Sequence, residues 1–461
     1  MKIAVLCGSS KQAKNSNTMQ YLFYLAKHFP KHDFSFLNVG FFFNSVTPDM
    51  QFFEESMKTI KNSDAVLWAF PVYFGLVPFS LKQFIEKVFE TKRQLIFKDK
   101  YTASFSTSIH ILDDVAHAYL RGICEDWEMN YYGFFSVDIY DYFSSKKMKD
   151  LTIFTDCFFS AVSQNEPCQI FFQKNHDTPA KYVPGKSFNK ISLKNKRLLL
   201  IEHCLTPESN IKKMTSRFES QFAEKIPVIQ LQSLGLKTGC YGCLKCGYNN
   251  ICPLEDFPSI SNVNSQIKQS DIIIFSGEVK DRFFSSLWKL FFDRSFSRGH
   301  LSGKLQGKQV GFIASGPFFN SNILNKFFVS FAEISGANLV GIVSDESNCS
   351  KTIDRLLHIL STNSVSFSEK NYSSPVTSSG LGTIKITRDN IYGRLSSVFH
   401  ADHSLFKKSG LFDFPQNQRL SWYRNRLILL LLKLPYLRKL YYDRLPSLLP
   451  FLYKKFGQRK K

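Results

Sequence analysis

The sequence predicts an α/β protein of two tandem domains, each with a doubly wound parallel sheet, followed by a basic helical tail. Three observations support this prediction. Short apolar runs alternate with amphipathic helical patterns, the same succession of patterns occurs twice, and 461 residues are too many for one compact core. We place the two domains at residues 1–180 and 196–365, and the linker with its tail at 366–461.

The first domain shows the alternation of strand and helix patterns most clearly. Apolar runs with the length of buried strands occur at Ile3–Cys7, Ala65–Phe70, Thr102–Thr107 and Phe134–Ile139. Helical periodicity occurs between them, at Thr18–Phe29 and Phe79–Phe89. Strands that are apolar on both faces are typical of a parallel sheet covered by helices on both sides.

The pattern starts again after a polar, proline-containing stretch at residues 164–195. Arg197–Ile201 matches the opening strand, and two later strands, Ser270–Phe275 and Gln309–Ala314, match strands of the first domain at offsets of 207 and 208 residues. The second copy has gained about a dozen residues after its first strand, and the added interval contains four cysteines. The chain therefore contains an internal duplication.

The turn after the first strand has the composition of a phosphate-binding turn. It runs from Gly8 to Thr18 with the sequence GSSKQAKNSNT, and a helix follows directly. Small hydroxyl residues and the free N–H groups of a helix N-terminus supply donors that converge on a phosphate. An ordinary polar turn with a helix cap remains the alternative for this segment taken alone.

The loop after the strand at Ala65–Phe70 has the composition of a site for a planar ring. It reads PVYFGLVPFSLK from Pro71 to Lys82, and in open α/β sheets ligands bind beyond the carboxyl ends of the strands. An aromatic side chain there can stack on a ring, while the prolines hold the shape of the loop. We therefore expect the phosphate turn and this loop to form one site.

These two segments, GSS…SNT and DAVLWAFPVYFGLVPFSLKQFIE, resemble the NADPH-dependent FMN reductase group of the flavodoxin-like superfamily. The resemblance implies a flavodoxin-like fold, FMN as cofactor and NAD(P)H as electron donor. It places Ser9, Ser10, Ser16, Asn17 and Thr18 around the FMN phosphate, Pro71, Val72, Tyr73, Phe74 and Gly75 along the isoalloxazine, and Ser106, Thr107, Ser108 and His110 at a further flavin contact. It assigns no catalytic residue. A purely structural role for His110 and His117 stays open.

Four cysteines of the second domain have the spacing of a metal site. Cys240, Cys243, Cys246 and Cys252 form the pattern C-x2-C-x2-C-x5-C. Three thiolates at two-residue gaps can wrap one face of a cuboidal cluster and a fourth can close it, so the spacing predicts a [4Fe-4S] cluster. Structural zinc sites more often use two C-x2-C pairs with a longer spacer. Zinc and redox-active cysteines remain alternatives.

The cysteine motif and its position are similar to those of the iron–sulfur flavoproteins of anaerobes. The second domain departs from the family where FMN would bind. Its phosphate turn, Glu202–Asn210, lacks the glycine and carries two carboxylates, and its ring loop, Ser276–Arg282, has neither the proline nor the aromatic residue. We therefore expect FMN on the first domain and the cluster on the second, close together as in a covalent pseudo-dimer.

This arrangement predicts an oxidoreductase that transfers electrons between NAD(P)H, or a reduced carrier such as a ferredoxin-like protein, and an unidentified acceptor. FMN takes up two electrons and releases them singly, whereas a [4Fe-4S] cluster carries one at a time, so the pair suits such an exchange. Two alternatives stay open. One is an NAD(P)H-dependent FMN or quinone reductase with a purely structural cluster, and the other is a non-enzymatic, zinc-stabilised module associated with a membrane.

The formal net charge of +21 is concentrated in the tail. Residues 419–461 contain twelve lysines and arginines and a single acid, Asp443. Apolar residues alternate with these bases in an amphipathic pattern interrupted by Pro435 and Pro446, which fits either a helix packed on the body or peripheral contact with an anionic membrane. No recognition motif accompanies the charge, so nucleic acid is not expected as a partner. A homo-oligomer stays open.

The location in the cell is predicted from the apolar segments. The thickness of the bilayer requires a transmembrane helix of roughly 18 to 20 apolar residues. No apolar run in the sequence is that long. The first residues, MKIAVLCGSS, are typical of a buried strand and not of a signal peptide. We therefore expect a cytoplasmic protein, with contact at the membrane surface as the further option.

Overall fold

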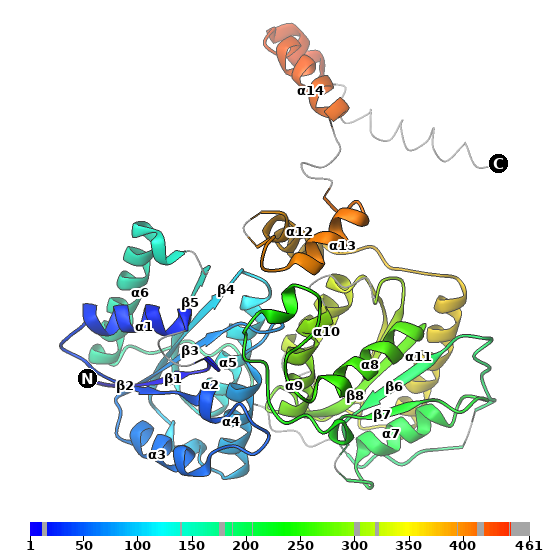
Figure 1. Ribbon diagram of the computed structural model, residues 1–461, viewed down its shortest axis with the longest axis horizontal. Helices are drawn as coiled ribbons and strands as arrows, with labels where there is room; N and C mark the ends of the chain where they lie inside the picture. The colour runs from blue at the N-terminus through cyan, green and yellow to red at the C-terminus, as the bar shows by residue number, and fades with distance from the viewer. Residues whose placement is uncertain are drawn as a thin grey trace. The chain divides into compact units, whose positions relative to one another are not determined.

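The computed structural model describes residues 1–11, 16–138, 141–174, 180–186, 188–204, 206–298, 305–318, 322–393, 395–412, 419–441 and 443. The chain divides into two compact units, Met1–Leu405 and Phe406–Lys461. The first unit contains two parallel sheets flanked by helices, so the predicted pair of flavodoxin-like domains is confirmed (Figure 1). We refer to the first and second sheets with their helices as module one and module two.

The sheet of module one has the strand order β2-β1-β3-β4-β5, with every neighbouring pair parallel. This is the doubly wound order of flavodoxin-like proteins. Its strands are β1 Lys2–Cys7, β2 Asp33–Leu37, β3 Ala65–Pro71, β4 Tyr101–Ser108 and β5 Asn130–Asp138. The predicted strands coincide with β1, β3, β4 and β5, except that Ile139 lies outside the described residues. The short, half-exposed β2 was not predicted.

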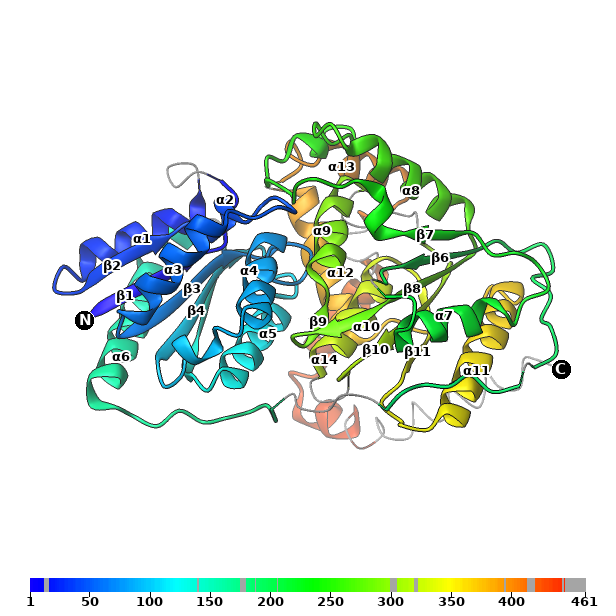
Figure 2. The ribbon, with the colours of Figure 1, turned by 90° about the horizontal axis from the view of Figure 1, so that it is seen from below.

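Helices cover both faces of this sheet. They are α1 Asn17–His28, α2 Val39–Phe42, α3 Met50–Lys61, α4 Phe79–Glu90, α5 Asp113–Asp126 and α6 Ser145–Gln164. Alternate residues of β1 enter different cores: Ile3 and Val5 pack with α1 and α6, whereas Ala4 and Leu6 pack with α3, α4 and α5. The second of these cores continues into module two, which Figure 2 shows next to α4 and α5.

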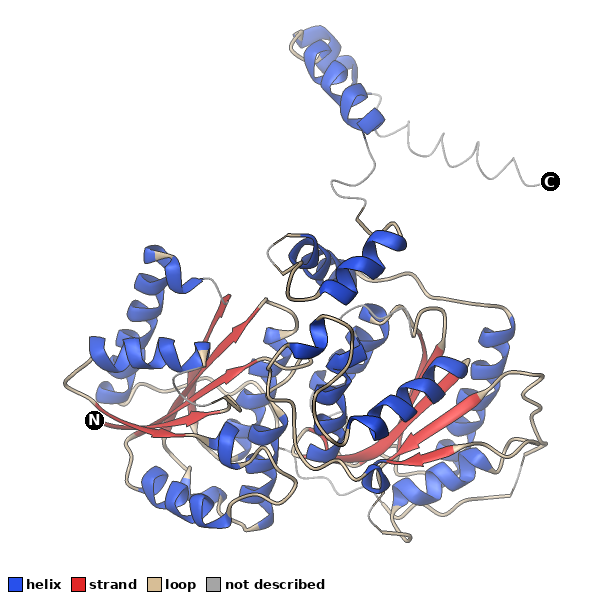
Figure 3. Cartoon of the chain, viewed as in Figure 1, coloured by secondary structure: helices blue, strands red, loops and turns tan. Residues whose placement is uncertain are grey.

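Module two repeats the same strand order, as β7-β6-β8-β10-β11 (Figure 3). Its strands are β6 Leu198–Glu202, β7 Val228–Gln230, β8 Ile272–Lys280, β10 Gln309–Ser315 and β11 Asn338–Ser344, and a short β9, Phe283–Phe284, pairs antiparallel with β8. Its helices are α7 Asn210–Glu219, α8 Phe257–Gln269, α9 Ser286–Arg294, α10 Asn322–Ile334 and α11 Ser350–Glu369. The duplication seen in the sequence is therefore a duplication of the fold.

Three helices follow module two along the chain. They are α12 Ser378–Tyr392, which packs on α10, then α13 His400–Lys408 and α14 Arg419–Leu431. Helix α14 ends just before the predicted break at Pro435, while Pro446 lies outside the described residues. In the part of the chain that the structure describes, no helix has both the length and the apolar character needed to span a membrane.

Helices α4 and α9 join the two modules through reciprocal hydrogen bonds. The first N–H of α4, at Phe79, donates to Oδ2 of Asp293 in α9 over 2.8 Å. In return the first N–H of α9, at Ser286, donates to Oε1 of Glu86 in α4 over 2.7 Å. The first N–H groups of a helix have no acceptor within the helix, and here the other module supplies one for each helix. The exchange is that of a two-fold symmetric interface, here within one chain.

Two buried lysines extend the same symmetry. Lys82 of α4 forms an ion pair with Glu86 over 2.8 Å and a second one with Asp281 in the loop after β8. Lys289 of α9 forms an ion pair with Asp293 and donates to the carbonyl of Tyr73, in the loop after β3, over 2.8 Å. Both lysine side chains are fully buried. Each module therefore holds the loop of the other with a charged group that has no access to water.

Removal of the Asp293 carboxylate tests how strongly this interface holds the modules. Asp293→Ala leaves the Lys289 ammonium without its carboxylate and the Phe79 N–H without its acceptor. Loss of one partner from a buried ion pair costs about 3–5 kcal/mol, so we expect the free energy of unfolding from urea denaturation to fall by that amount.

The matched control is Glu90→Ala, which breaks the exposed pair that Glu90 forms with Lys87 over 2.7 Å. Exposed pairs contribute less than about 1 kcal/mol, so this variant should unfold nearly as the parent does. Equal losses in the two variants would mean that the buried pair has no special role between the modules.

Candidate functional site

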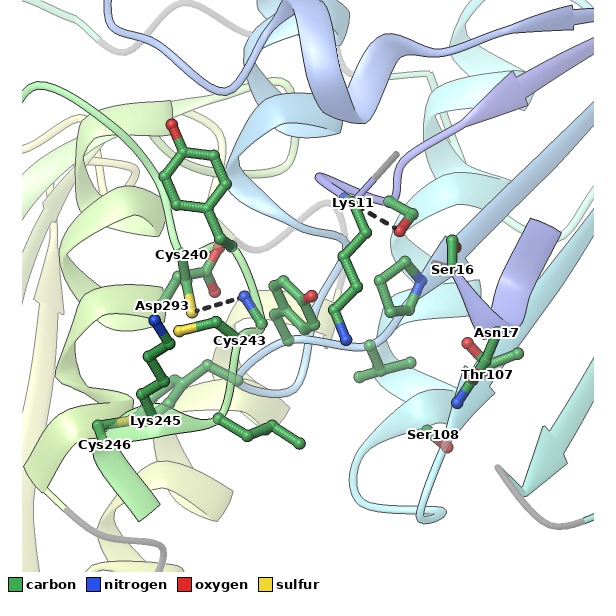
Figure 4. Close-up of a pocket in the computed structure, with 18 of the residues that line it drawn as sticks. Lys11, Ser16, Asn17, Thr107, Ser108, Cys240, Cys243, Lys245, Cys246 and Asp293 are labelled. Atoms are coloured by element: carbon green, nitrogen blue, oxygen red, sulfur yellow. Dashed lines mark hydrogen bonds between the residues drawn. The ribbon is translucent and has the colours of Figure 1, made fainter. Parts of the chain in front are cut away.

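A pocket of about 560 Å³ lies between the two modules, within the range that holds small ligands (Figure 4). Module one contributes the turn after β1, the loop after β3 and the end of β4. Module two contributes Asp293 and the loop that carries the four cysteines. The predicted flavin residues that line the pocket are Ser9, Ser16, Asn17, Thr18, Pro71, Val72, Tyr73, Phe74, Thr107 and Ser108.

The start of helix α1 forms the polar end of this pocket. The Ser16 hydroxyl caps the helix by accepting from the N–H of Met19, and the hydroxyl of Thr18 lies 2.7 Å from that of Thr107 at the end of β4. The free N–H groups and the positive dipole end of a helix favour an anion. Figure 4 shows Ser16 and Asn17 next to Thr107 and Ser108. This end of the pocket can hold a phosphate.

The loop after β3 forms a tight turn next to the polar end. Tyr73 and Leu76 exchange backbone hydrogen bonds of 3.0 and 3.1 Å, and Phe74 and Gly75 have positive φ angles of 43° and 70°. Gly75 does not line the pocket, because it faces Leu112, whose Cδ1 would lie 2.7 Å from an added Cβ. Burial raises the pKa of Tyr73, so its hydroxyl stays protonated. The loop therefore presents an apolar wall to the pocket.

Three other predicted flavin residues also lie away from the pocket lining. Ser10 donates to the carbonyl of Cys240 over 3.0 Å, and Ser106 lies 2.8 Å from Nε2 of His117. His117 is buried, and burial lowers its pKa to about 3, which fits the structural role left open for this histidine. His110 pairs with Asp113 over 2.9 Å on the outer side of the turn after β4.

His110 and Asp113 form an ion pair in which each group shifts the pKa of the other. The hydrogen bond that the His110 imidazole donates to the Asp113 carboxylate raises the pKa of His110. Burial would raise the pKa of Asp113, but hydrogen bonds from His110 and Ser136 outweigh it and lower that pKa to about 2. The depressed carboxyl pKa gives stability that is lost as the pH falls below 3.8, and the raised imidazole pKa gives stability that is lost as the pH rises above 6.5.

Asp113→Asn should return the pKa of His110 toward its ordinary 6.5 in an NMR titration. The variant should lose most stability relative to the parent between pH 3.8 and 6.5, where both members of the pair are charged. Asp114→Asn, at the neighbouring position, removes only an exposed pair with Lys326 and should leave the His110 pKa unchanged. An unshifted His110 in Asp113→Asn would show that the pairing is wrong.

The cysteine loop of module two lies directly on module one. The N–H of Gly239 donates to the carbonyl of Asn44 over 3.0 Å, which fixes the start of the loop. Gly242, at a φ of 61°, touches Tyr73, since an added Cβ would lie 2.1 Å from the tyrosine hydroxyl and 3.6 Å from Cε of Lys11. Any larger residue at position 242 would separate the cysteine loop from the loops that line the flavin side of the pocket.

All four predicted ligand cysteines line the same pocket as the flavin residues. Burial raises the pKa of Cys240 to about 12 and that of Cys246 to about 11, and the neighbouring thiols add to both shifts. Among the described residues, no three His, Cys, Asp or Glu side chains converge closely enough to hold a metal ion. The donor set has the chemistry of a cluster site, but the thiols do not form a metal centre as they stand.

Several lining residues were not singled out from the sequence. Lys11 and Lys245 bring two ammonium groups to the pocket, and Leu395 and Phe399 come from the segment after α12. That segment lies on the cysteine loop, because an added Cβ on Gly247 would be 2.1 Å from the carbonyl of Val398. No motif marks this segment, so only the folded chain shows that it covers the thiols.

Phe399→Ala should expose the thiols below this cover. Cys246 is 8% exposed in the parent, and we expect its alkylation rate in reduced, metal-free protein to rise about tenfold, as measured by mass spectrometry. Leu381→Ala, at an exposed position of α12, is the control. The thiol of Cys124, buried in the core of module one, reports global unfolding. An unchanged alkylation rate of Cys246 would show that the segment does not protect the pocket.

The corresponding position of module two is occupied by its own chain. Ser209 caps α7 as Ser16 caps α1, and the next residue, Asn210, donates to Oδ2 of Asp345 over 2.8 Å. Asp345 is fully buried and accepts from the hydroxyl of Ser315, at the end of β10, and from the N–H of Gly316. A carboxylate of the protein thus lies where an anionic ligand would bind, in keeping with a single flavin site in module one.

The topology and the pocket define a flavodoxin-like α/β protein with a ligand-sized pocket between its two modules. Residues 1–133 match the family model described as NADPH-dependent FMN reductase, which confirms the resemblance of module one to that family. No curated protein matches the chain.

Solved structures give low-similarity matches. The flavoenzyme NAD(P)H:(acceptor) oxidoreductase FerB of Paracoccus denitrificans is 22% identical, with a TM-score of 0.29, and the match covers 35% of this chain and 97% of that one. The FMN-dependent NADH-azoreductase of Bacillus anthracis, in complex with FMN, is 11% identical, with a TM-score of 0.28, and the match covers 36% and 98%. The strand order, and not these matches, establishes the fold.

Proposed function

We propose that the protein is an NAD(P)H-dependent FMN oxidoreductase whose flavin binds in the pocket between the modules. Two observations support this. The family match covers module one, and the pocket combines a helix N-terminus suited to phosphate with an apolar wall suited to a planar ring. NAD(P)H is the donor that the family description suggests, and a ferredoxin-like carrier is the alternative.

The residues of the chain divide the work of holding FMN. The start of α1, with Ser16, Asn17 and Thr18, would hold the phosphate, and the loop from Pro71 to Phe74 would lie along the ring. Lys11 adds a positive charge to the pocket beside the cysteine loop. Bound FMN supplies the capacity to accept a hydride and to release electrons singly. The protein orients the flavin and excludes water from it with Phe399 and the cysteine loop.

We further infer that Cys240, Cys243, Cys246 and Cys252 hold a [4Fe-4S] cluster beside the flavin. The observation that carries this inference is that one pocket is lined by the flavin residues and by all four thiols. Side chains would have to close around the cluster, since the thiols do not converge without it. Binding of iron would also replace the protons that burial keeps on Cys240 and Cys246.

Metal and flavin analysis of anaerobically purified protein tests this assignment. We expect one FMN with about four iron and four sulfide per chain. Cys243→Ser should lose iron and keep FMN, whereas Cys157→Ser, at an exposed cysteine of α6, should keep both. Stoichiometric zinc without iron would show that the four cysteines hold zinc and not an iron–sulfur cluster. Full NAD(P)H turnover by flavin-loaded Cys243→Ser would make the cluster structural.

Asn17→Asp tests the flavin site alone. A carboxylate at the first residue of α1 would repel the phosphate and offset the positive end of the helix dipole. We therefore expect FMN to bind at least about tenfold more weakly in a fluorescence titration. Asn62→Asp makes the same change at the exposed end of α3 and should leave the affinity unchanged. Equal affinities in the two variants would place the phosphate elsewhere.

A further inference from the structure

The tail of the chain, residues 419–461, combines strong positive charge with exposed leucines. It holds twelve lysines and arginines against one acid. We call this segment the basic tail. Neither the flavin site nor the cysteine loop accounts for it, because both lie in the unit Met1–Leu405.

Helix α14 of the basic tail is apolar on more than one side. Leu427, Leu429 and Leu430 are 61%, 62% and 58% exposed, and Leu431 follows directly with 48%. Successive residues of an α-helix are turned by about 100° from one another, so these leucines point in different directions around the axis. The exposed leucines give the C-terminal half of α14 a broad apolar surface whose burial would be favourable.

A second short helical stretch begins at Pro435, and this stretch and the turn before it repeat the composition. Leu434 is 57% and Tyr436 76% exposed. The bases Lys433, Arg438 and Lys439 stand among them and are also exposed. Exposed apolar and cationic side chains therefore occur together on both sides of Pro435 in the described part of the basic tail.

We propose that the basic tail binds an anionic lipid surface. The leucines enter the boundary between headgroups and acyl chains, and the lysines and arginines contact the anionic headgroups. Such an interface buries the apolar surface of a helix while it keeps the ends of long basic side chains in the polar layer. The described helices are too short and too charged to cross the bilayer, so the tail lies at its surface.

Charge and shape favour lipid over the other partners. A nucleic acid would neutralise the bases but leave the leucines in water. A second copy of this chain would bring together two segments with the same large positive charge.

Co-sedimentation of the full chain with lipid vesicles tests the proposal. We expect binding to vesicles of phosphatidylcholine mixed with phosphatidylglycerol, and at least about tenfold weaker binding to phosphatidylcholine alone. Raising the salt concentration from about 0.1 to 0.5 M should also weaken binding to the mixed vesicles, because salt screens the attraction between the charges. A chain that ends before residue 419 should not bind, while its thermal unfolding, which reports Met1–Leu405, stays unchanged.

Two substitutions separate the apolar and the ionic parts of the interaction. Leu430→Ser with Leu431→Ser removes apolar contacts, and Arg438→Gln with Lys439→Gln removes charge. Each pair should weaken binding about tenfold or more, and only the second should reduce the salt dependence. Lys146→Gln with Lys149→Gln, on the exposed surface of α6, is the control and should change nothing.

Three results would overturn the proposal. Binding that survives deletion of the tail would place the contact elsewhere. Equal binding to neutral and anionic vesicles would show that charge plays no part. Tail-dependent dimers, or tail-dependent binding of RNA without any binding of vesicles, would assign the tail to another partner. None of these results depends on whether the chain carries FMN, so they leave the proposed enzymatic function unaffected.

Discussion

The reciprocal contact between α4 and α9 is the constraint on which the rest of the first unit depends. Each helix begins on a carboxylate of the other module, and each buried lysine holds the loop of the other module. Because these groups are buried, the contact has one geometry and tolerates no sliding. It sets the cysteine loop of module two on the phosphate turn of module one, where Ser10 and Gly242 complete the fit.

The two copies of the fold have diverged around this fixed contact. In module one the end of β4 and the start of α1 leave room for an anion beside Thr107. In module two the equivalent space holds the buried carboxylate of Asp345, which takes the donors of Ser315 and Gly316. The equivalent space in module two is therefore filled and not empty, since these donors have an internal acceptor and support the fold.

The sequence was sufficient for the fold because its signals are local. Apolar runs located β1, β3, β4, β5, β6, β8 and β10, and the repeat of the pattern predicted two equivalent sheets. The partly exposed β2, β7 and β11 carry weaker signals and were missed. The pocket depends on contacts between distant segments, which no local pattern encodes. Spacing identified the four cysteines, but Leu395 and Phe399 carry no motif and became visible only because residues 395–400 fold back on the cysteine loop.

A covalent tandem can do what a dimer of identical chains cannot. In a symmetric dimer every change in one site appears in both, so a cysteine loop gained by one partner would also be gained by the other. Here Glu86 and Asp293 still play equivalent parts in the α4–α9 contact, although the loops that line the pocket differ between the modules. Once the halves were joined in one chain, one copy could keep the open helix N-terminus while the other supplied thiols to the same pocket. The pocket is therefore a product of the duplication, and neither module contains it alone.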